Sequence, residues 1–147
     1  MGTTTFSGPV KAGTIREGAS ANVGFALMAQ SANITFAADG TTTVVATVPA
    51  NSQIFQITVD VTTAFDAGTT NTLDIGDGTT ADKYADALAL GSAARVLATS
   101  DVSQIGNLID IGTSDVDVTV TYNQSGTAAT AGAATVTVLY IQNNNLS

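Results

Sequence analysis

Three stretches of the chain alternate apolar and polar residues with a period of two, and this pattern restricts the fold more than any other feature. They span residues 54–65, 114–122 and 133–142. Successive side chains of a strand point to opposite faces, so each stretch predicts a strand with one buried and one solvated face. In the third stretch, Leu139 and Ile141 make the second face apolar as well. We expect that strand to end at a second layer or at a partner chain.

In the first of these stretches the apolar positions predicted to share a face are Phe55, Ile57, Val59 and Val61. In the second they are Val116, Val118, Val120 and Tyr122, and in the third Val136, Val138 and Tyr140. Weaker strand candidates cover about residues 20–29, 33–38, 42–48 and 71–76.

Turn signals separate these strands at Asp39-Gly40, residues 49–51, Ala67-Gly68 and residues 124–126. Asp-Gly between two apolar runs is the strongest hairpin signal, so we expect strands 33–38 and 42–48 to pair. Short strands at this spacing predict an all-β fold, an antiparallel β-sandwich with a jelly-roll-like form, as a single domain over residues 1–147. Residues 1–18 are predicted to form an extended N-terminal arm. Strand order is left open, because jelly-roll and immunoglobulin-like sandwiches share this alternation.

The alternation lapses over residues 79–108, which we expect to be irregular or to hold a short helix. In "TADKYADALAL", Thr79 or Thr80 would cap the helix, Tyr84 and Leu88 would share one face, and Gly91 would end it. A helix of this length is marginal unless it packs against another element. An irregular loop is therefore the alternative.

The chain has no His and no Cys, which excludes the usual Ser-His-Asp, Cys-His, zinc and haem chemistry. No phosphate-binding glycine pattern is present either. Asp115 and Asp117 are two residues apart on a predicted strand and have the spacing of a paired-carboxylate glycosidase. They fall on the solvated face, however, where both would ionise. We therefore expect no enzyme activity and no cofactor.

The stretch "TLDIGDGTTADKYADAL", residues 72–88, holds four aspartates around two glycines. No register of it places oxygen ligands at the positions of an EF-hand loop. A loop of backbone carbonyls with Asp77 and Asp82 is the candidate calcium site. We expect instead a tight turn without a metal, in which residues 76–78 supply the positive-φ positions and Asp74 faces solvent from a strand end.

The net charge is −8, with twelve acidic and four basic residues, and the basic residues are scattered along the sequence. Such a charge repels phosphate backbones, so we expect no nucleic-acid partner. No apolar run approaches the roughly 18 residues of a membrane span, and no signal peptide of the usual kind is recognisable at the start. We therefore expect a protein without a membrane partner.

Two motifs resemble those of the small β-sandwich head-decoration, or cement, proteins of tailed bacteriophages. They are "FSGPVKAG" at residues 6–13 and "TLDIGDGTTADKYADA" at residues 72–87, and a β-rich C-terminal half follows them. The resemblance implies a non-enzymatic virion protein, made in the host bacterial cytoplasm, that binds the outer capsid surface. It also implies a homotrimer whose partner is the major capsid protein, and which bridges capsomers and stabilises the expanded head.

On this resemblance the capsid contact is expected in the N-terminal arm, at Phe6, Pro9, Val10, Lys11, Ile15 and Arg16. Leu139, Ile141 and Leu146 are the expected oligomer contacts, and Tyr84 is a possible exposed contact. The alternative function is a carbohydrate- or receptor-binding module of a tail fibre or surface adhesin. Such sites display aromatic side chains beside polar groups, and this chain has no Trp and only three Tyr.

Overall fold

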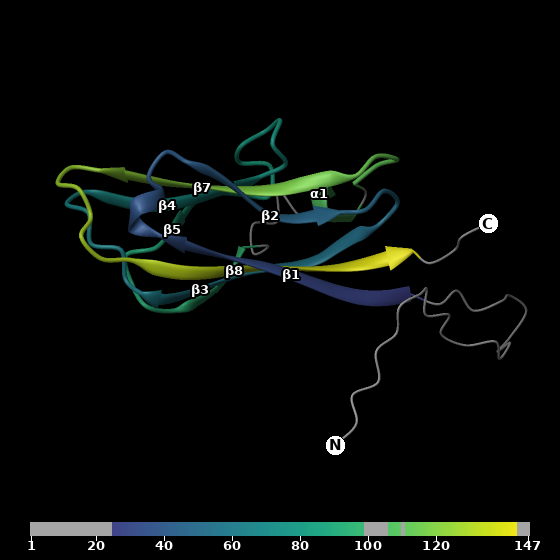
Figure 1. Ribbon diagram of the computed structural model, residues 1–147, viewed down its shortest axis with the longest axis horizontal. Coiled ribbons are helices and arrows are strands. Elements are labelled where there is room, and N and C mark those ends of the chain that lie inside the picture. The colour runs from purple at the N-terminus through teal and green to yellow at the C-terminus, as the bar shows by residue number, and fades with distance from the viewer. Residues whose placement is uncertain (1–24, 99–105, 110, 144–147) are drawn as a thin grey trace, which may run out of the picture.

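The computed structural model describes residues 25–98, 106–109 and 111–143, which form a sandwich of two four-stranded antiparallel sheets (Figure 1). Sheet A contains, in spatial order, β1 (Phe25–Thr35), β8 (Ala133–Asn143), β3 (Gln53–Thr63) and β6 (Arg95–Leu97). Sheet B contains β2 (Thr42–Val48), β7 (Val116–Ser125), β4 (Thr70–Gly76) and β5 (Ala85–Ala89). A 3-10 turn, η1 (Phe36–Ala38), and a four-residue helix, α1 (Gly106–Ile109), complete the elements. Of the helices in this part of the chain, none is long and apolar enough to cross a membrane. The predicted all-β sandwich is confirmed.

The strands pair in a nested order. β4 pairs with β5, and β2 with β7, in sheet B, whereas β3 pairs with β6, and β1 with β8, in sheet A. This is the order of one long hairpin folded over on itself, as in a jelly-roll-like sandwich. It differs from the immunoglobulin order, in which the first two strands are neighbours in one sheet. The nested order resolves the alternative that the sequence left open.

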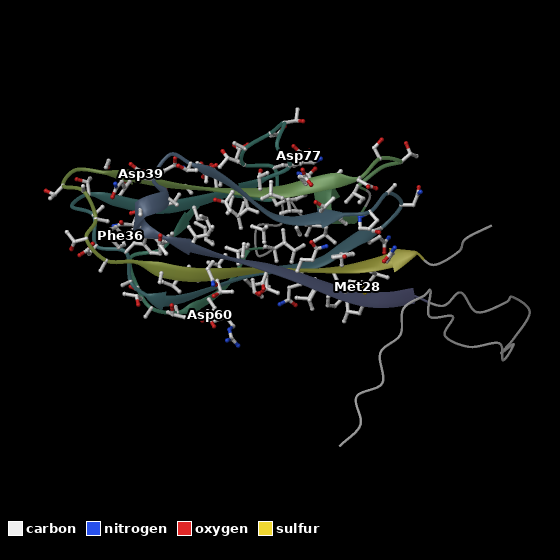
Figure 2. The ribbon with its side chains drawn as sticks, in the orientation of Figure 1. Met28, Phe36, Asp39, Asp60 and Asp77 are labelled. Carbon is white, nitrogen blue, oxygen red and sulfur yellow. The ribbon has the colours of Figure 1, made fainter. Side chains whose placement is uncertain are left out.

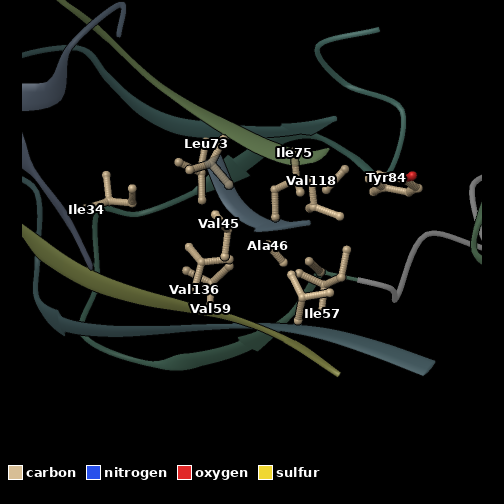
Figure 3. Packing of buried hydrophobic residues seen from close by; sticks show 14 of the residues in the cluster. Ile34, Val45, Ala46, Ile57, Val59, Leu73, Ile75, Tyr84, Val118 and Val136 are labelled. Carbon is tan, nitrogen blue, oxygen red and sulfur yellow. The ribbon is translucent and has the colours of Figure 1, made fainter. Parts of the chain in front are cut away.

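The core lies between the two sheets and consists mainly of Val and Ile side chains (Figure 3). Leu73, Ile75 and Val118 of sheet B face Ile57, Val59 and Val136 of sheet A. The alternation predicted for β7 and β8 is confirmed, with Val116 only partly buried at the start of β7. Because these side chains are short and β-branched, they fill a thin layer and suit strands better than helices.

The predicted inward position of Phe55 is wrong. Its side chain is 61% exposed, while its neighbour Ile54 is buried. The register of β3 against β8 shifts between Ile54 and Gln56, so Phe55 is the extra residue of a β-bulge. Because of the bulge, Ile54 and Ile57 both face the core although they are three residues apart, and Phe55 faces outward. Alternation resumes after it, as predicted from Ile57 onward.

The Asp39-Gly40 turn exists, but the predicted hairpin across it is wrong. Gly40 has a φ of +66°, and its N–H donates to the carbonyl of Tyr122 at 2.8 Å. The strands on either side of the turn, β1 and β2, lie in different sheets. The turn therefore carries the chain across the sandwich. The two strands predicted over residues 20–29 and 33–38 are joined in β1 as far as Thr35, whereas residues 36–38 form η1 and not a strand.

The helix predicted after Thr80 is also wrong, because residues 85–89 form the edge strand β5. Their register against β4 shifts between Leu73 and Ile75, and Ala87 takes a left-handed φ of +49°. Asp74 stabilises this irregularity, since its Oδ1 accepts the Ala87 N–H at 2.9 Å and its Oδ2 accepts the Asn123 amide at 2.7 Å. The residues with helical spacing thus satisfy their backbone through β4 instead.

Gln30 joins the two sheets along one side of the sandwich. Its amide nitrogen donates to the Thr47 carbonyl at 3.0 Å, and its amide oxygen accepts the Thr47 N–H at 3.3 Å. The same nitrogen lies 2.8 Å from the Tyr140 hydroxyl. A side chain of β1 therefore satisfies the backbone of β2 in the way a neighbouring strand would.

Two buried tyrosines differ in what their hydroxyl groups contact. Tyr122 packs its ring against Phe65 with centroids 4.6 Å apart and donates to Asn71 Oδ1 at 2.8 Å. The Tyr84 hydroxyl is also buried, but among the described residues it has no hydrogen-bond partner. A buried hydroxyl without a partner is destabilising by about 1–3 kcal/mol.

Replacing each tyrosine by phenylalanine should therefore have unequal effects. Tyr122→Phe is expected to lower the free energy of unfolding by about 1 kcal/mol, since it removes a hydrogen bond. Tyr84→Phe should leave that free energy unchanged or raise it. Urea unfolding followed by circular dichroism measures both variants. A larger loss for Tyr84→Phe than for Tyr122→Phe would contradict the described packing.

Candidate interaction surface

The loop between β4 and β5, residues 77–84, folds back over the outer face of sheet B. Gly76 allows it, because a Cβ at this position would collide with the Thr80 carbonyl oxygen. Gly78 has a φ of +77°, which confirms one of the predicted positive-φ positions, and its N–H donates to Thr119 Oγ1 at 3.1 Å. Thr119 is buried on the outer face of the sheet for this reason.

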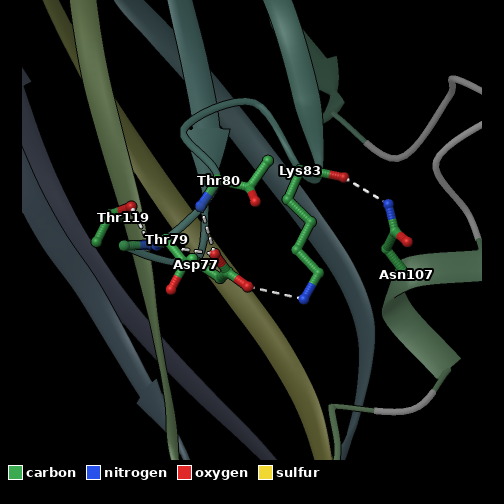
Figure 4. Close-up of polar contacts among 7 residues, drawn as sticks. Asp77, Thr79, Thr80, Lys83, Asn107 and Thr119 are labelled. Carbon is green, nitrogen blue, oxygen red and sulfur yellow. Dashed lines mark hydrogen bonds and ion pairs between the residues drawn. The ribbon is translucent and has the colours of Figure 1, made fainter.

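Asp77 organises this loop (Figure 4). Its Oδ1 accepts the N–H groups of Thr79 at 3.0 Å and Thr80 at 2.8 Å, and its Oδ2 forms an ion pair with Lys83 Nζ at 2.7 Å. Partial burial opposes ionisation, but the Lys83 ammonium and the two N–H groups outweigh it and hold the Asp77 pKa below 3.8. The carboxylate therefore stays charged at neutral pH and acts as a structural acceptor.

This arrangement does not support the candidate calcium site at Asp77 and Asp82. Lys83 already supplies the positive charge at Asp77, and a calcium ion would have to displace it. Asp82 is exposed. Within the described ranges, no three acidic residues gather closely enough to hold a metal ion. The glycine turn after a strand describes the stretch better. Asp74, however, accepts hydrogen bonds from β5 and β7, where it was expected only to face solvent.

The prediction that Tyr84 is an exposed contact is wrong. Its side chain is 1% exposed, and this burial, with the charge of Asp77, raises its pKa to about 12. The Lys83 ammonium lies 5.7 Å from the centre of its ring, and Asn107 of α1 donates to the Lys83 carbonyl at 2.8 Å. Tyr84 therefore anchors the 77–84 loop in the core, with α1 beside it.

Asp115 and Asp117 connect β7 and the residue before it to β2 and to the turn after β2. Asp115 Oδ1 accepts the Ala50 N–H at 2.9 Å, and Asp117 Oδ1 accepts the Thr47 hydroxyl at 2.6 Å. Both carboxylates are exposed, as the alternation predicted. Each is used to hold β2, or the turn that follows it, against β7, so the pair is accounted for without glycosidase chemistry.

Asp66 fastens the turn after β3 to the turn before β8. Its Oδ1 accepts the N–H groups of Thr130 at 2.7 Å and Ala131 at 2.9 Å, and its Oδ2 accepts the Thr130 hydroxyl at 2.8 Å. The Ala131 and Thr130 N–H groups lower the pKa of Asp66 below 3.8. Like Asp77, Asp66 binds the backbone of a loop through its ionised form.

The outer face of sheet A carries apolar side chains from all four of its strands, and those from β1, β3 and β6 are exposed. Leu27 on β1 is 61% exposed, Phe55 on β3 is 61% exposed and Leu97 on β6 is 43% exposed. Leu139 and Ile141 lie between them on β8 and are partly buried. Leu27 is the register partner of Ile141, and Leu139 is opposite Gln56, which follows Phe55. We call these five side chains the apolar patch.

The rest of this face is polar and nearly neutral. Thr135 donates to Asn33 at 2.9 Å, and Arg95 pairs with Asp60 at 2.7 Å. Asp60 is the one aspartate of the described chain on the outer face of sheet A, and Arg95 neutralises it. A partner can therefore approach this face without meeting unpaired negative charge.

The outer face of sheet B is different in character. Its strands are joined by hydroxyl pairs, such as Thr42 with Thr121 at 3.0 Å and Thr70 with Ser125 at 2.6 Å. The 77–84 loop and the aspartates at its base lie on this side, and Asp60 and Asp77 stand on opposite sides of the sandwich (Figure 2). One exposed apolar side chain on this face, Val44, is 52% exposed. The two faces therefore offer different chemistry to a partner.

The predicted site residues are only partly within the described chain. Leu139 and Ile141 lie together on the apolar patch, whereas Leu146 and the six predicted capsid contacts of the N-terminal arm fall outside the described residues. The sequence reasoning missed Leu27, Phe55 and Leu97. Ile54 and Phe55 are adjacent apolar residues at the start of β3, so they cannot both belong to the alternating pattern that contains the buried Ile57. This break in the alternation was the available signal for Phe55.

No family model matches the chain, and neither does any curated protein. Among solved structures, the chain is similar to one in the structure described as "Cyanophage Pam1 capsid asymmetric unit", with a TM-score of 0.56 and 19% sequence identity. The match covers 87% of this chain and 94% of that chain, so the two are nearly equal in length. At this identity the likeness establishes a shared fold.

Acid should destabilise the protein through Asp66 and Asp77. The pKa of each in the folded state lies below 3.8, so their contribution to stability is fully present above that value and is lost as pH falls through the folded pKa. We expect the melting temperature to drop from about pH 5 to below about pH 3. Asp77→Asn should melt lower at pH 5 and lose less on acidification. Asp82→Asn, at an exposed position, is the control and should follow the wild type.

Proposed function

We propose that the protein is a capsid decoration, or cement, protein of a tailed bacteriophage. It binds the outer surface of the capsid, where its partner is the major capsid protein, and it stabilises the expanded head by bridging capsomers. It acts as a binding protein without enzyme activity, and it requires neither nucleic acid nor a membrane. On this proposal it is made in the host bacterial cytoplasm and ends on the virion.

The observation that carries this proposal is the likeness to a chain of a capsid asymmetric unit. That chain has the same fold over nearly the same length, so the likeness is not to one module of a much larger protein. The two sequence motifs, which resemble those of decoration proteins, point independently to the same class. A β-sandwich alone supports many functions, and the agreement of these two observations favours a capsid role.

The unequal faces of the sandwich support a protein that sits between a shell and solvent. A decoration protein needs one face for other proteins and one face that stays soluble. The outer face of sheet A offers the apolar patch and a neutralised ion pair, whereas the outer face of sheet B offers hydroxyl groups and most of the acidic side chains described above. Exposed apolar patches of this kind mark protein contacts more often than chance.

We infer that copies associate as a trimer through the apolar patch. Leu139 and Ile141, predicted as oligomer contacts, are partly buried on the same face as the exposed Leu27 and Phe55, so a neighbouring copy that covers one covers the others. Each chain has a net charge of −8, so copies repel one another. The apolar patch carries no charge, and the repulsion is therefore weakest where two patches meet. Leu146 would extend the contact beyond β8.

A trimer binds the shell at three points at once, so avidity rises without strong individual contacts. The contacts proposed for each copy are the arm residues Phe6, Pro9, Val10, Lys11, Ile15 and Arg16. Because the trimer binds the expanded shell in preference to the precursor, it shifts the equilibrium toward the expanded state. At a free concentration of 100 times Kd, this amounts to about 2.7 kcal/mol for each site.

Co-sedimentation with heads of the cognate phage tests this proposal. The purified protein should pellet with expanded heads and stay in solution with unexpanded ones, and heads that carry it should resist heat or chelator better than bare heads.

The alternative, a glycan- or receptor-binding module, lacks an exposed tyrosine, since Tyr84, Tyr122 and Tyr140 are all buried. Retention on a glycan array together with failure to bind heads would support that alternative and overturn the proposal.

The trimer is tested separately by light scattering coupled to size exclusion. Phe55→Ser should shift the mass from trimer toward monomer, because it removes a large exposed apolar side chain from the patch. Val44→Ser is the matched control, since Val44 is similarly exposed on the outer face of the other sheet. Both variants should keep the wild-type free energy of unfolding to within about 0.5 kcal/mol, the usual effect of an exposed substitution. A wild-type monomer, or equal effects of the two variants, would contradict the assignment.

A further inference from the structure

The sandwich has four edge strands, and three of them are protected against pairing with another chain. β6 is only three residues long. β5 is five residues long and is distorted by its register shift and by the left-handed Ala87. β2 shifts register between Val44 and Ala46, and the Gln30 side chain hydrogen-bonds to the backbone N–H and C=O groups of Thr47. Short strands, bulges and covered backbone groups are the usual means of blocking an edge.

The fourth edge strand, β1, has none of these protections. It is eleven residues long and pairs with β8 in an unbroken register from Phe25↔Asn143 to Thr35↔Ala133. Its sequence, "FALMAQSANIT", contains neither charge nor proline. Among the described residues no strand lies on its other side. A long, regular and uncharged edge of this kind is a template for an added strand.

Met28 shows where the edge is incomplete. It is opposite Tyr140, whose side chain is buried, and it therefore faces the interior of the sandwich. Even so, Met28 is 41% exposed, whereas Ile34 on the same face of β1 is buried. Figure 2 places Met28 near the N-terminal end of β1, beyond the point where Gln30 holds β1 to β2. Among the described residues, no side chain covers the interior beside Met28.

We propose that this end of β1 receives an extended segment of the capsid shell protein, which adds a fifth strand to sheet A. The inference rests on the proposed function and names the surface at which the shell binds. The segment that fits is uncharged, with an apolar side chain at the position that covers Met28. Its backbone would pair with the N–H and C=O groups of β1 that no described strand contacts.

A second copy of the chain fits this edge less well than the shell does. Pairing β1 with its own copy generates a two-fold axis, which a trimer lacks. A three-fold ring of edge contacts needs a different edge strand on the neighbour, and the other three edges are protected. The position of the edge also favours the shell, since residues 1–24, which hold the predicted capsid contacts, join the described chain at Phe25.

An inward charge at the open edge should block strand addition while the fold is kept. We expect Met28→Lys to weaken binding to expanded heads of the cognate phage at least tenfold, because the added strand would bury the ammonium. Since Met28 is already partly exposed, the variant should keep the wild-type melting temperature and oligomeric mass. Val44→Lys, on the outer face of sheet B, is the control and should bind as the wild type does.

Hydrogen exchange on the wild-type protein gives a second measurement that does not depend on a variant. Amides of residues 25–30 should exchange more slowly when the full chain is bound to expanded heads, while those of β2 should change little. Binding of Met28→Lys at wild-type strength, or unchanged exchange in β1 on bound protein, would overturn this inference and leave the proposed function intact. Failure of the wild-type protein to bind heads would instead overturn the proposed function itself.

Discussion

Strands that follow one another in the sequence lie in opposite sheets, apart from β4 and β5, and most of the structure depends on this constraint. Neither sheet can complete its hydrogen bonds until the chain has crossed the sandwich several times, and each crossing buries apolar side chains of both sheets. The backbone pairing and the Val-Ile core therefore form together. Because β1 pairs with β8, the first and the last strand of the described chain are neighbours in sheet A. Folding through such distant pairings is slow compared with that of a helical bundle of the same size.

The alternation in the sequence predicted that strands exist and which face most of their residues take, as Val118, Val136 and Ile57 show. It could not predict pairing, because a period of two is the same in every strand. The Asp39-Gly40 signal was read as a hairpin for that reason, since the same turn geometry also serves a crossing between sheets. The helical spacing of Tyr84 and Leu88 misled in a similar way, because hydrogen bonds to β4 and from Asp74 outweigh a weak local preference.

The candidate surface was less predictable than the fold. Leu139 and Ile141 were found because an apolar residue on the solvated side of a strong strand stands out in the sequence. Phe55 lies in a bulge whose one local signal is the pair of adjacent apolar residues Ile54 and Phe55, and Leu27 and Leu97 belong to strands whose faces depend on register with distant partners. The aspartates of residues 72–88 looked like a site for chemistry. Asp74 and Asp77 instead accept backbone N–H groups, and Asp77 also pairs with Lys83, so these two carboxylates fix loops.

Phe25 and Asn143 are register partners, so both ends of the described chain leave sheet A at the same end of the sandwich (Figure 1). The 77–84 loop, in contrast, stands over the outer face of the other sheet, with Thr79, Thr80 and Asp82 exposed at its tip. A peptide joined to the described chain at Phe25 or Asn143 would thus emerge beside the open edge and the apolar patch. The same peptide inserted at the loop tip would project from the opposite side, which makes that tip the natural position for displaying foreign sequence on a particle.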